Sequence, residues 1–217
     1  MIPQAVVFDL GKVLVDFDYS IATQRIAAHG TLPAAQVYRW FCTSPLLLQY
    51  ESGSLSKEQF FKEICAATGF RGGLAEFGQF FADIFSPIDP MIDLHAQLRV
   101  QKVPTYIFSN TNDLAIDHIR ANFPFFKHFD DFIFSYEHGV MKPEAGLYEV
   151  VERMSGRKGP EILYLDDRLE NVEAGARRGW QIIHHTAPET TRALVQKLGL
   201  LGNAAHDASS VPVLPKV

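Results

Sequence analysis

The sequence predicts an α/β fold, in which a doubly wound, Rossmann-like parallel sheet carries a helical bundle inserted after its first strand. The first reason is a set of short apolar runs that stop at polar residues: residues 5–8 end at Asp9, and residues 163–165 run into Asp166. Runs of this length are typical of buried strands in a parallel sheet. The second reason is that helical and strand patterns alternate from Asp89 onward, which implies parallel strands joined by right-handed crossovers.

The stretch between the first strand and Asp89 predicts the inserted bundle, because its patterns from about residue 19 to residue 85 are helical. Ser56 opens a capping box that is followed by apolar residues at the spacing of one helix face. We expect four or five helices here. They would form an inserted domain of residues 18–86 on a core domain made of residues 1–17 and 87–202.

The remaining elements alternate along the rest of the chain. Helices are expected from Asp89, from Asp113, near residues 147–154 and 172–176, and over residues 188–200. Strands are expected at residues 105–109, 132–135, 162–165 and 181–184. The short run 140–142, which stops at Lys142 and Pro143, is interpreted as a further strand. Residues 203–217, polar at first and then rich in valine and proline, predict a loosely ordered tail.

Composition and charge restrict the possible partners. A formal net charge of −5 over 217 residues gives no reason to expect binding to nucleic acid or to an anionic membrane. No run approaches the ~20 apolar residues that span a bilayer, and Asp9 and Lys12 interrupt the first apolar run, which favours a strand over a signal peptide. Cys42 and Cys65 are expected to be reduced. We expect a cytoplasmic monomer or homodimer.

Polar residues close four apolar runs, and in a doubly wound sheet the strand ends meet at the edge where ligands bind. In chain order they are Asp9, Ser109, Lys142 and the pair Asp166-Asp167. Taken singly, aspartate and serine are common in turns and caps, and a lysine is common at the surface. Two adjacent carboxylates at the end of a buried strand, however, repel each other unless a cation is near. Carboxylates, carbonyls and water are the usual ligands of Mg²⁺.

This order of aspartate, serine, lysine and an aspartate pair resembles the four motifs of the haloacid dehalogenase-like (HAD) hydrolase superfamily, over about residues 5–185. The resemblance implies that Asp9 is a nucleophile whose aspartyl-phosphate divides one difficult displacement into two easier steps. It implies that Ser109 and Asn110 hold the phosphoryl oxygens through a hydroxyl group and backbone amides. Lys142, in a Gly-x-x-Lys-Pro segment, would neutralise the nucleophile and the phosphoryl group.

The same resemblance implies a Mg²⁺ cofactor. Asp167, with Asn171 four residues later as in the family's Asp-Asp-x-x-x-Asn form, would be a direct ligand. Asp166 would support the site or reach the metal through water. Asp9 and the backbone carbonyl of Gly11 would supply the remaining protein ligands.

The inserted bundle resembles the helical cap of the haloacid dehalogenase-like branch of this superfamily. Within that branch, residues 8–14, residues 16–18 and the cap segment 50–56 look most like bacterial sugar-1-phosphate phosphatases, including those acting on α-D-glucose 1-phosphate. The resemblance therefore implies a Mg²⁺-dependent phosphatase of a small phosphate monoester, with a sugar phosphate favoured. The expected partner is that small molecule.

One position departs from the pattern of most HAD phosphatases. Two residues after the nucleophile they carry a second aspartate, which protonates the leaving oxygen, whereas this chain has Gly11. General acid catalysis is worth ~10²–10⁴-fold. The sugar-1-phosphate phosphatases share the glycine, and an anomeric oxygen leaves more readily than an ordinary alkoxide. Alternatively, Asp16, Asp18 or a cap residue such as Glu51 or His29 supplies the proton, although a surface or capping role is the commoner one for residues of these types.

Two other functions remain open on the sequence alone. Haloacid dehalogenases also lack that second aspartate, because a halide leaves without a proton. They usually need no cation, so the Asp166-Asp167 pair would then have no explanation. The third possibility is a non-catalytic phosphate-binding or protein-binding HAD-like module. The presence of Asp9, Lys142 and Asp167 together favours an enzyme.

Overall fold

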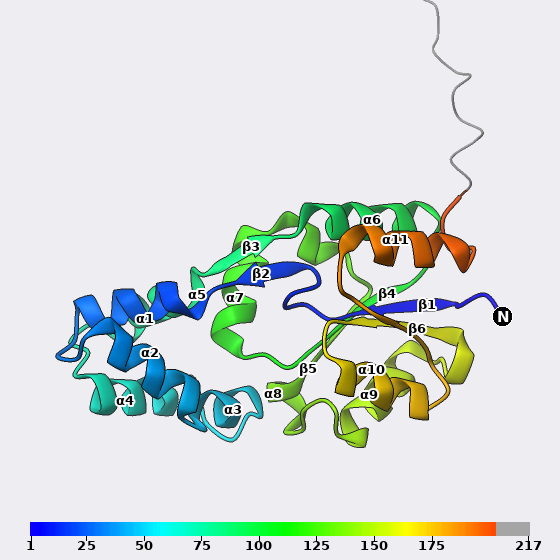
Figure 1. The fold of residues 1–217 in the computed structure, drawn as a ribbon. Helices are drawn as coiled ribbons and strands as arrows, with labels where there is room; N and C mark the ends of the chain where they lie inside the picture. The colour runs from blue at the N-terminus through cyan, green and yellow to red at the C-terminus, as the bar shows by residue number, and fades with distance from the viewer. Residues whose placement is uncertain (203–217) are drawn as a thin grey trace, which may run out of the picture.

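In a computed structural model, five parallel strands form a sheet with helices on both faces, and five further helices lie beside it (Figure 1). The structure describes residues 1–202, so the predicted tail of residues 203–217 lies outside the described part. The strand order is β5-β4-β1-β6-β7. The strands are β1 (Ala5–Phe8), β4 (Thr105–Ser109), β5 (Asp131–Phe134), β6 (Ile162–Asp166) and β7 (Gln181–His184). The predicted fold class is confirmed.

Alternate side chains of the strands β1, β4, β5 and β6 enter two different hydrophobic cores. On β1, Val6 and Phe8 face one core with α6, α7 and α11, whereas Ala5 and Val7 face the other with α9 and α10. Figure 1 shows α6 and α11 on one side of the sheet and α9 and α10 on the other. These helices are α6 (Asp89–Val100), α7 (Asp113–Asn122), α9 (Ala145–Ser155), α10 (Leu169–Arg177) and α11 (Pro188–Lys197). Burial on both faces explains why the strands are continuous apolar runs.

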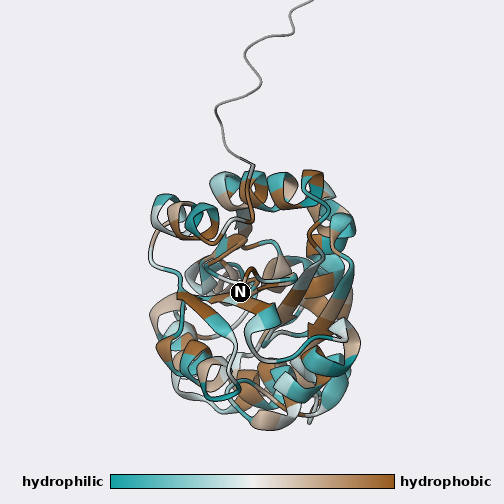
Figure 2. Ribbon diagram, turned by 90° about the vertical axis from the view of Figure 1, so that its right-hand side faces the viewer, coloured by the Kyte–Doolittle hydropathy of each residue, from teal (hydrophilic) through white to brown (hydrophobic). Residues whose placement is uncertain are grey.

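Figure 2 shows hydrophobic strands at the centre of this part of the molecule, with hydrophilic residues on the helices around them. Short 3₁₀ helices at Pro124–His128 and Gly159–Glu161 precede β5 and β6. None of the helices within residues 1–202 combines the length and the apolar character needed to cross a membrane.

The cap lies between β2 (Val15–Phe17) and β3 (Phe85–Pro87) and has a hydrophobic core of its own. Its helices are α1 (Tyr19–Ala28), α2 (Ala34–Thr43), α3 (Leu46–Glu51), α4 (Lys57–Thr68) and α5 (Leu74–Ala82). Tyr50, Phe60 and Phe81 are buried together at its centre, and the rings of Tyr50 and Phe60 stack with centroids 4.3 Å apart. The predicted capping box is confirmed: Ser56 and Gln59 each accept a hydrogen bond from the backbone N–H of the other.

The chain enters and leaves the cap through a two-stranded antiparallel ribbon that the sequence did not predict. β2 (Val15–Phe17) pairs with β3 (Phe85–Pro87), so that Val15 lies opposite Pro87 and Phe17 opposite Phe85. Each strand has only three residues and one contains a proline, so neither carries a recognisable strand pattern. The two connections between core and cap therefore lie side by side.

One local prediction is wrong. Residues 140–142 are not a strand but lie in the loop between α8 (Ser135–His138) and α9. Gly139 ends α8 in the left-handed conformation, with φ of 66°, and Pro143 cannot donate to a strand ladder. Helix α7 starts at Asp113 as expected, and the side chain of Asn112 caps it by accepting a hydrogen bond from the Ala115 N–H at 3.0 Å.

Candidate active site

Asp9 and Lys142 form a buried ion pair at the carboxyl end of the central strand. Asp9 follows β1 directly, and its Oδ1 lies 2.9 Å from Nζ of Lys142 and accepts a hydrogen bond of 2.7 Å from the Leu10 N–H. The Lys142 ammonium also donates to the backbone oxygen of Phe108 at 2.8 Å and to Asp166 at 2.7 Å. All three of its acceptors come from the neighbouring strand ends of β1, β4 and β6, as the parallel register requires.

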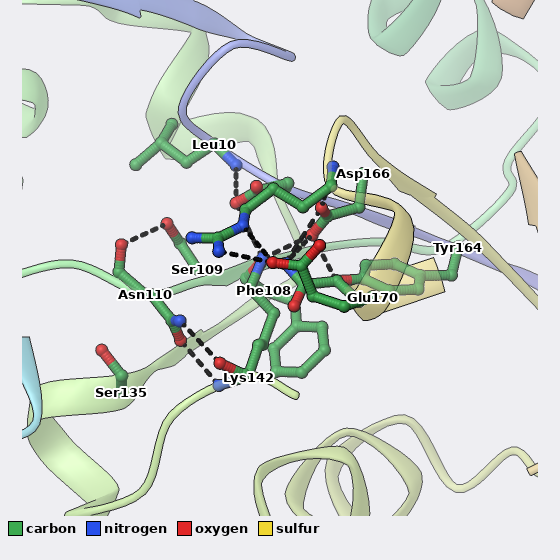
Figure 3. A network of polar contacts seen from close by, with 12 residues as sticks. Leu10, Phe108, Ser109, Asn110, Ser135, Lys142, Tyr164, Asp166 and Glu170 are labelled. Carbon is green, nitrogen blue, oxygen red and sulfur yellow. Dashed lines mark hydrogen bonds and ion pairs between the residues drawn. The ribbon is translucent and has the colours of Figure 1, made fainter. Parts of the chain in front are cut away.

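Asn110 holds the loop that carries Lys142. Its side-chain oxygen accepts from the Lys142 N–H at 2.8 Å, and its side-chain nitrogen donates to the Lys142 carbonyl at 3.0 Å. Figure 3 shows these reciprocal bonds beside Ser109, whose side chain is buried at the end of β4. The predicted residues Ser109, Asn110 and Lys142 are thus adjacent in space, although Lys142 follows no strand.

Asp166 is fully buried at the end of β6, and several donors surround its carboxylate. Besides Lys142, it accepts hydrogen bonds from the Tyr164 hydroxyl, from the Arg168 N–H at 2.8 Å and from the Asn171 side chain at 3.0 and 3.1 Å. Figure 3 shows Tyr164 and Lys142 converging on it. Asn171, the other end of the Asp-Asp-x-x-x-Asn pattern, therefore binds Asp166 and fixes its orientation.

The carboxylates of Asp9, Asp166 and Asp167 form a group suited to a metal ion. One oxygen from each lies within 4.8 Å of the others. Together with Lys142 these groups have an excess of negative charge when ionised. Oxygen donors with this excess fit a hard divalent cation such as Mg²⁺. Because Asp166 already accepts hydrogen bonds from four residues, Asp9 and Asp167 have more coordination capacity left.

Burial and charge shift the proton equilibria of these groups. Burial raises the pKa of Asp9 to about 7, although the charge of Lys142 opposes the shift. Burial would raise the pKa of Asp166 too, but the ammonium of Lys142 outweighs it and holds this pKa below its ordinary value. Burial alone would lower the pKa of Lys142, yet the two carboxylates raise it, so the ammonium stays charged. A bound cation would favour the ionised form of Asp9.

Asp9, Lys142 and Asp167 lie at the floor of a cavity of about 550 Å³ between the core and the cap. Most of the residues predicted for the site line it, and they are Asp9, Gly11, Ser109, Asn110, Lys142 and Asp167. Asp166 does not line the cavity and lies behind its wall. Reasoning from motifs missed several lining residues, which are Lys12, Phe17, Tyr19, Leu47, Leu48, Met141, Glu144 and Arg168. They lie on the cap, the ribbon and loops, where the sequence has no strand-end signal.

Two of these additional residues bring positive charge to the cavity. Lys12 forms an ion pair with Asp16, and Arg168 forms one with Glu170. Both ion pairs lie at exposed positions, so they are weak, and either cation can turn toward an anionic ligand at small cost.

Polar contacts fix α3 of the cap on the core. The Ser135 hydroxyl donates to the backbone oxygen of Glu51 at 2.5 Å, and the Tyr50 hydroxyl donates to Asp113 on α7. Gly53 approaches so closely that a Cβ atom added to it would lie 2.4 Å from the backbone oxygen of Tyr136. The cap segment that follows α3 therefore rests directly on α8, the short helix after β5.

We expect Gly53→Ala to destabilise this contact. The alanine would be held at φ of 71°, a left-handed conformation that costs about 1 kcal/mol or more for an L-residue, and its methyl group would collide with Tyr136. Gly156→Ala is a matched control, because Gly156 has φ of 65° but no described atom within 4 Å of the added Cβ. Thermal unfolding should show a larger decrease in Tm for Gly53→Ala than for Gly156→Ala. Equal decreases in Tm for the two variants would contradict a tight contact at Gly53.

Comparison with known proteins identifies the family. A family model for haloacid dehalogenase-like hydrolases matches residues 3–179. The chain belongs to this family. The resemblance inferred from the motifs is thereby confirmed, and the protein is a HAD-like hydrolase.

Relatives of this HAD-like hydrolase cover nearly its whole length. A D-ribitol-5-phosphate phosphatase from Bacteroides thetaiotaomicron is 25% identical over 206 residues, covering 92% of this chain and 98% of the relative. A sesquiterpene phosphatase from Aspergillus oryzae is 25% identical over 187 residues, covering 84% and 90%. A solved HAD family enzyme from Bacteroides thetaiotaomicron, in complex with magnesium and inorganic phosphate, has a TM-score of 0.75 at 22% identity, covering 85% of this chain and 95% of that chain. This structural similarity shows the shared fold.

Proposed function

We propose that this HAD-like hydrolase is a Mg²⁺-dependent phosphatase that hydrolyses a small phosphate monoester, with a sugar phosphate favoured, through an aspartyl-phosphate on Asp9. The observation that carries the proposal is the buried Asp9–Lys142 pair beside the Asp167 carboxylate at the floor of the cavity between core and cap. A nucleophile, a fixed cation and a set of metal-binding oxygens are the parts that phosphoryl transfer to a carboxylate needs.

Each residue has one task in this reaction. Asp9 attacks phosphorus, and Lys142 neutralises charge on Asp9 and on the phosphoryl oxygens. Ser109 lies beside Asp9 and donates its hydroxyl to one phosphoryl oxygen. Asn110 keeps Lys142 in place through its two bonds to the lysine backbone. Because these groups are held before substrate binds, little reorganisation is needed at the moment of reaction.

Asp9, Asp167 and the backbone carbonyl of Gly11 would hold Mg²⁺, with Asp166 supporting the site from behind. Bound there, Mg²⁺ supplies positive charge that draws the phosphate toward Asp9 and offsets the charge that builds up on the transferred group. Asp166 keeps the ammonium of Lys142 aimed at the same place through their 2.7 Å contact.

The relatives support a phosphate ester of an alcohol. One is named for ribitol 5-phosphate and the other for sesquiterpene phosphates, so both release an alcohol from a phosphate. The cavity has mixed walls, with the aromatic residues Phe17 and Tyr19 and the leucines Leu47 and Leu48 on one part and charged groups on the other. A sugar phosphate suits such walls, because its ring faces pack on aromatic groups while its hydroxyl groups reach polar ones.

The direct test is phosphate release from a panel of phosphate esters with Mg²⁺ and with excess chelator. The panel should contain sugar 1-phosphates, phosphates of primary alcohols and 4-nitrophenyl phosphate. Metal-dependent turnover of at least one sugar phosphate is the expected result. Halide release from a 2-haloacid without metal would instead identify a dehalogenase. Binding of phosphate without any turnover would identify a non-catalytic module.

A further inference from the structure

In this protein the ring of Phe17 occupies the space next to Gly11, where most HAD phosphatases have the side chain of their proton donor. A Cβ atom added to Gly11 would lie 2.9 Å from Cε1 of Phe17, whose ring comes from β2. An aspartate at this position would require the ring to move. The side chain that is absent at Gly11 is therefore replaced by an aromatic ring, which cannot donate a proton to the leaving oxygen.

Of the four residues that the sequence leaves open as a substitute donor, the structure places only one at the cavity. Asp16 forms an ion pair with Lys12 at the surface, and Asp18 caps α1. His29 lies at the end of α1. None of these three lines the cavity, whereas Glu51 does.

Glu51 is held at the cavity by its backbone and not by its side chain. It is the last residue of α3, and its carbonyl oxygen accepts the 2.5 Å hydrogen bond from Ser135. On either side of it, Tyr50 bonds to Asp113 and Gly53 packs on the core. Within residues 1–202, no group forms a hydrogen bond with the carboxyl group of Glu51, which remains available to a ligand.

The surroundings of Glu51 favour its protonated form. Burial raises the pKa of Glu51 to about 8; the negative charge of Asp9 adds to the shift and Arg168 opposes it. Tyr19 of α1 also lies near Glu51. Burial is the main reason why the pKa of Tyr19 is raised, and the charge of Glu51 contributes less. The groups that act on the carboxyl group of Glu51 thus come from both parts of the molecule. Asp9 and Arg168 belong to the core, and Tyr19 belongs to helix α1 of the cap. At neutral pH the group carries a proton that it can give away.

We propose that Glu51, delivered by the cap, is the general acid that protonates the leaving alcohol. This inference rests on the proposed phosphatase function. As the bond from Asp9 to phosphorus forms and the ester bond breaks, the proton of Glu51 passes to the departing oxygen, giving the alcohol and a Glu51 carboxylate. When water then attacks phosphorus and the bond to Asp9 breaks, the Glu51 carboxylate takes a proton from that water. The cycle restores both residues.

The test compares two esters whose leaving groups differ in their need for a proton. Nitrophenolate bears negative charge well, whereas a primary alkoxide does not. We therefore expect Glu51→Gln to lower kcat/KM for a primary-alcohol phosphate by ~10²–10⁴-fold and to leave kcat/KM for 4-nitrophenyl phosphate nearly unchanged. The ratio kcat/KM is the correct measure, because it reports the steps up to departure of the leaving group and excludes hydrolysis of the phosphoenzyme.

Three controls make the result specific. Glu144→Gln removes another carboxylate from the wall of the same cavity. It should not change the value of kcat/KM for the primary-alcohol phosphate relative to that for 4-nitrophenyl phosphate. Glu51→Asp keeps an acid and should recover part of the lost rate. Thermal unfolding of Glu51→Gln should match the wild type, because the contact with Ser135 uses the backbone. In the wild type, kcat/KM for the alkyl ester should fall as pH rises through about 8. The pH profile of Glu51→Gln should lack this decrease.

An equal loss of kcat/KM on both esters would mean that Glu51 binds or orients substrate, and no loss on either would mean that it takes no part; each result overturns the proposal. Wild-type protein that releases phosphate from no ester would instead overturn the proposed function.

Discussion

The Asp9→Asn variant should fold like the wild type and lose phosphate release by a factor on the order of 10⁴ or more, as expected when a nucleophile is removed. Asparagine has nearly the shape of aspartate, and its side-chain oxygen can still accept the hydrogen bond from Leu10. Lys142 keeps its ion pair with Asp166, so its buried charge remains compensated. The only large change is the loss of the attacking carboxylate.

The phosphoenzyme gives an independent measurement. Acid-quenched wild-type protein should carry a base-labile phosphate on Asp9, and Asp9→Asn should carry none. Asp93→Asn, which removes an exposed carboxylate from α6, is the matched control and should behave as the wild type. Undiminished phosphate release by purified Asp9→Asn would remove Asp9 from the role of nucleophile.

Activity should be strictly dependent on Mg²⁺, and Asp167→Ala should abolish it while leaving the fold intact. Asp167 lines the cavity and is half-buried, so its removal takes away a metal ligand without opening the core. Addition of Mg²⁺ should raise the Tm of the wild type, because a ligand that binds only the folded state stabilises it. The same addition should leave the Tm of Asp167→Ala unchanged.

Asp166→Ala separates support of the site from binding of the metal. It should retain more activity than Asp167→Ala among molecules that fold, because Asp166 supports the site from behind. Its stability should fall by about 3 kcal/mol or more, since removing one member of a buried ion pair leaves its partners uncompensated. Here Lys142, Tyr164 and Asn171 would lose their shared acceptor. Full wild-type activity in excess chelator would refute the magnesium site.

The sequence was a reliable guide where one physical cause dominates. Burial on both faces makes the central residues of β1, β4 and β6 apolar, so the positions of these strands could be predicted to within about a residue. Their carboxyl ends meet at one edge, and this is why Asp9, Ser109 and Asp166 could be expected together. The ribbon of β2 and β3 was missed because three residues are too few for a pattern to emerge.

Features that depend on contacts between distant segments could not be predicted. Residues 140–142 look like a strand, but Gly139 and Pro143 and the two bonds from Asn110 hold them as a loop. The position of the Glu51 backbone depends on Ser135, a residue 84 positions away. Likewise, nothing near Gly11 indicates that the ring of Phe17 fills the adjacent space.

The ribbon that joins core and cap makes the two parts modular. Because Phe17 and Phe85 lie opposite each other in antiparallel strands, a short turn could join them without disturbing the sheet. The whole insertion can thus be exchanged as one cassette at two neighbouring connections. Asp9, Lys142 and Asp167 belong to the part that stays, whereas Glu51 travels with the cassette. Choice of leaving group can therefore be inherited separately from the chemistry of attack on phosphorus.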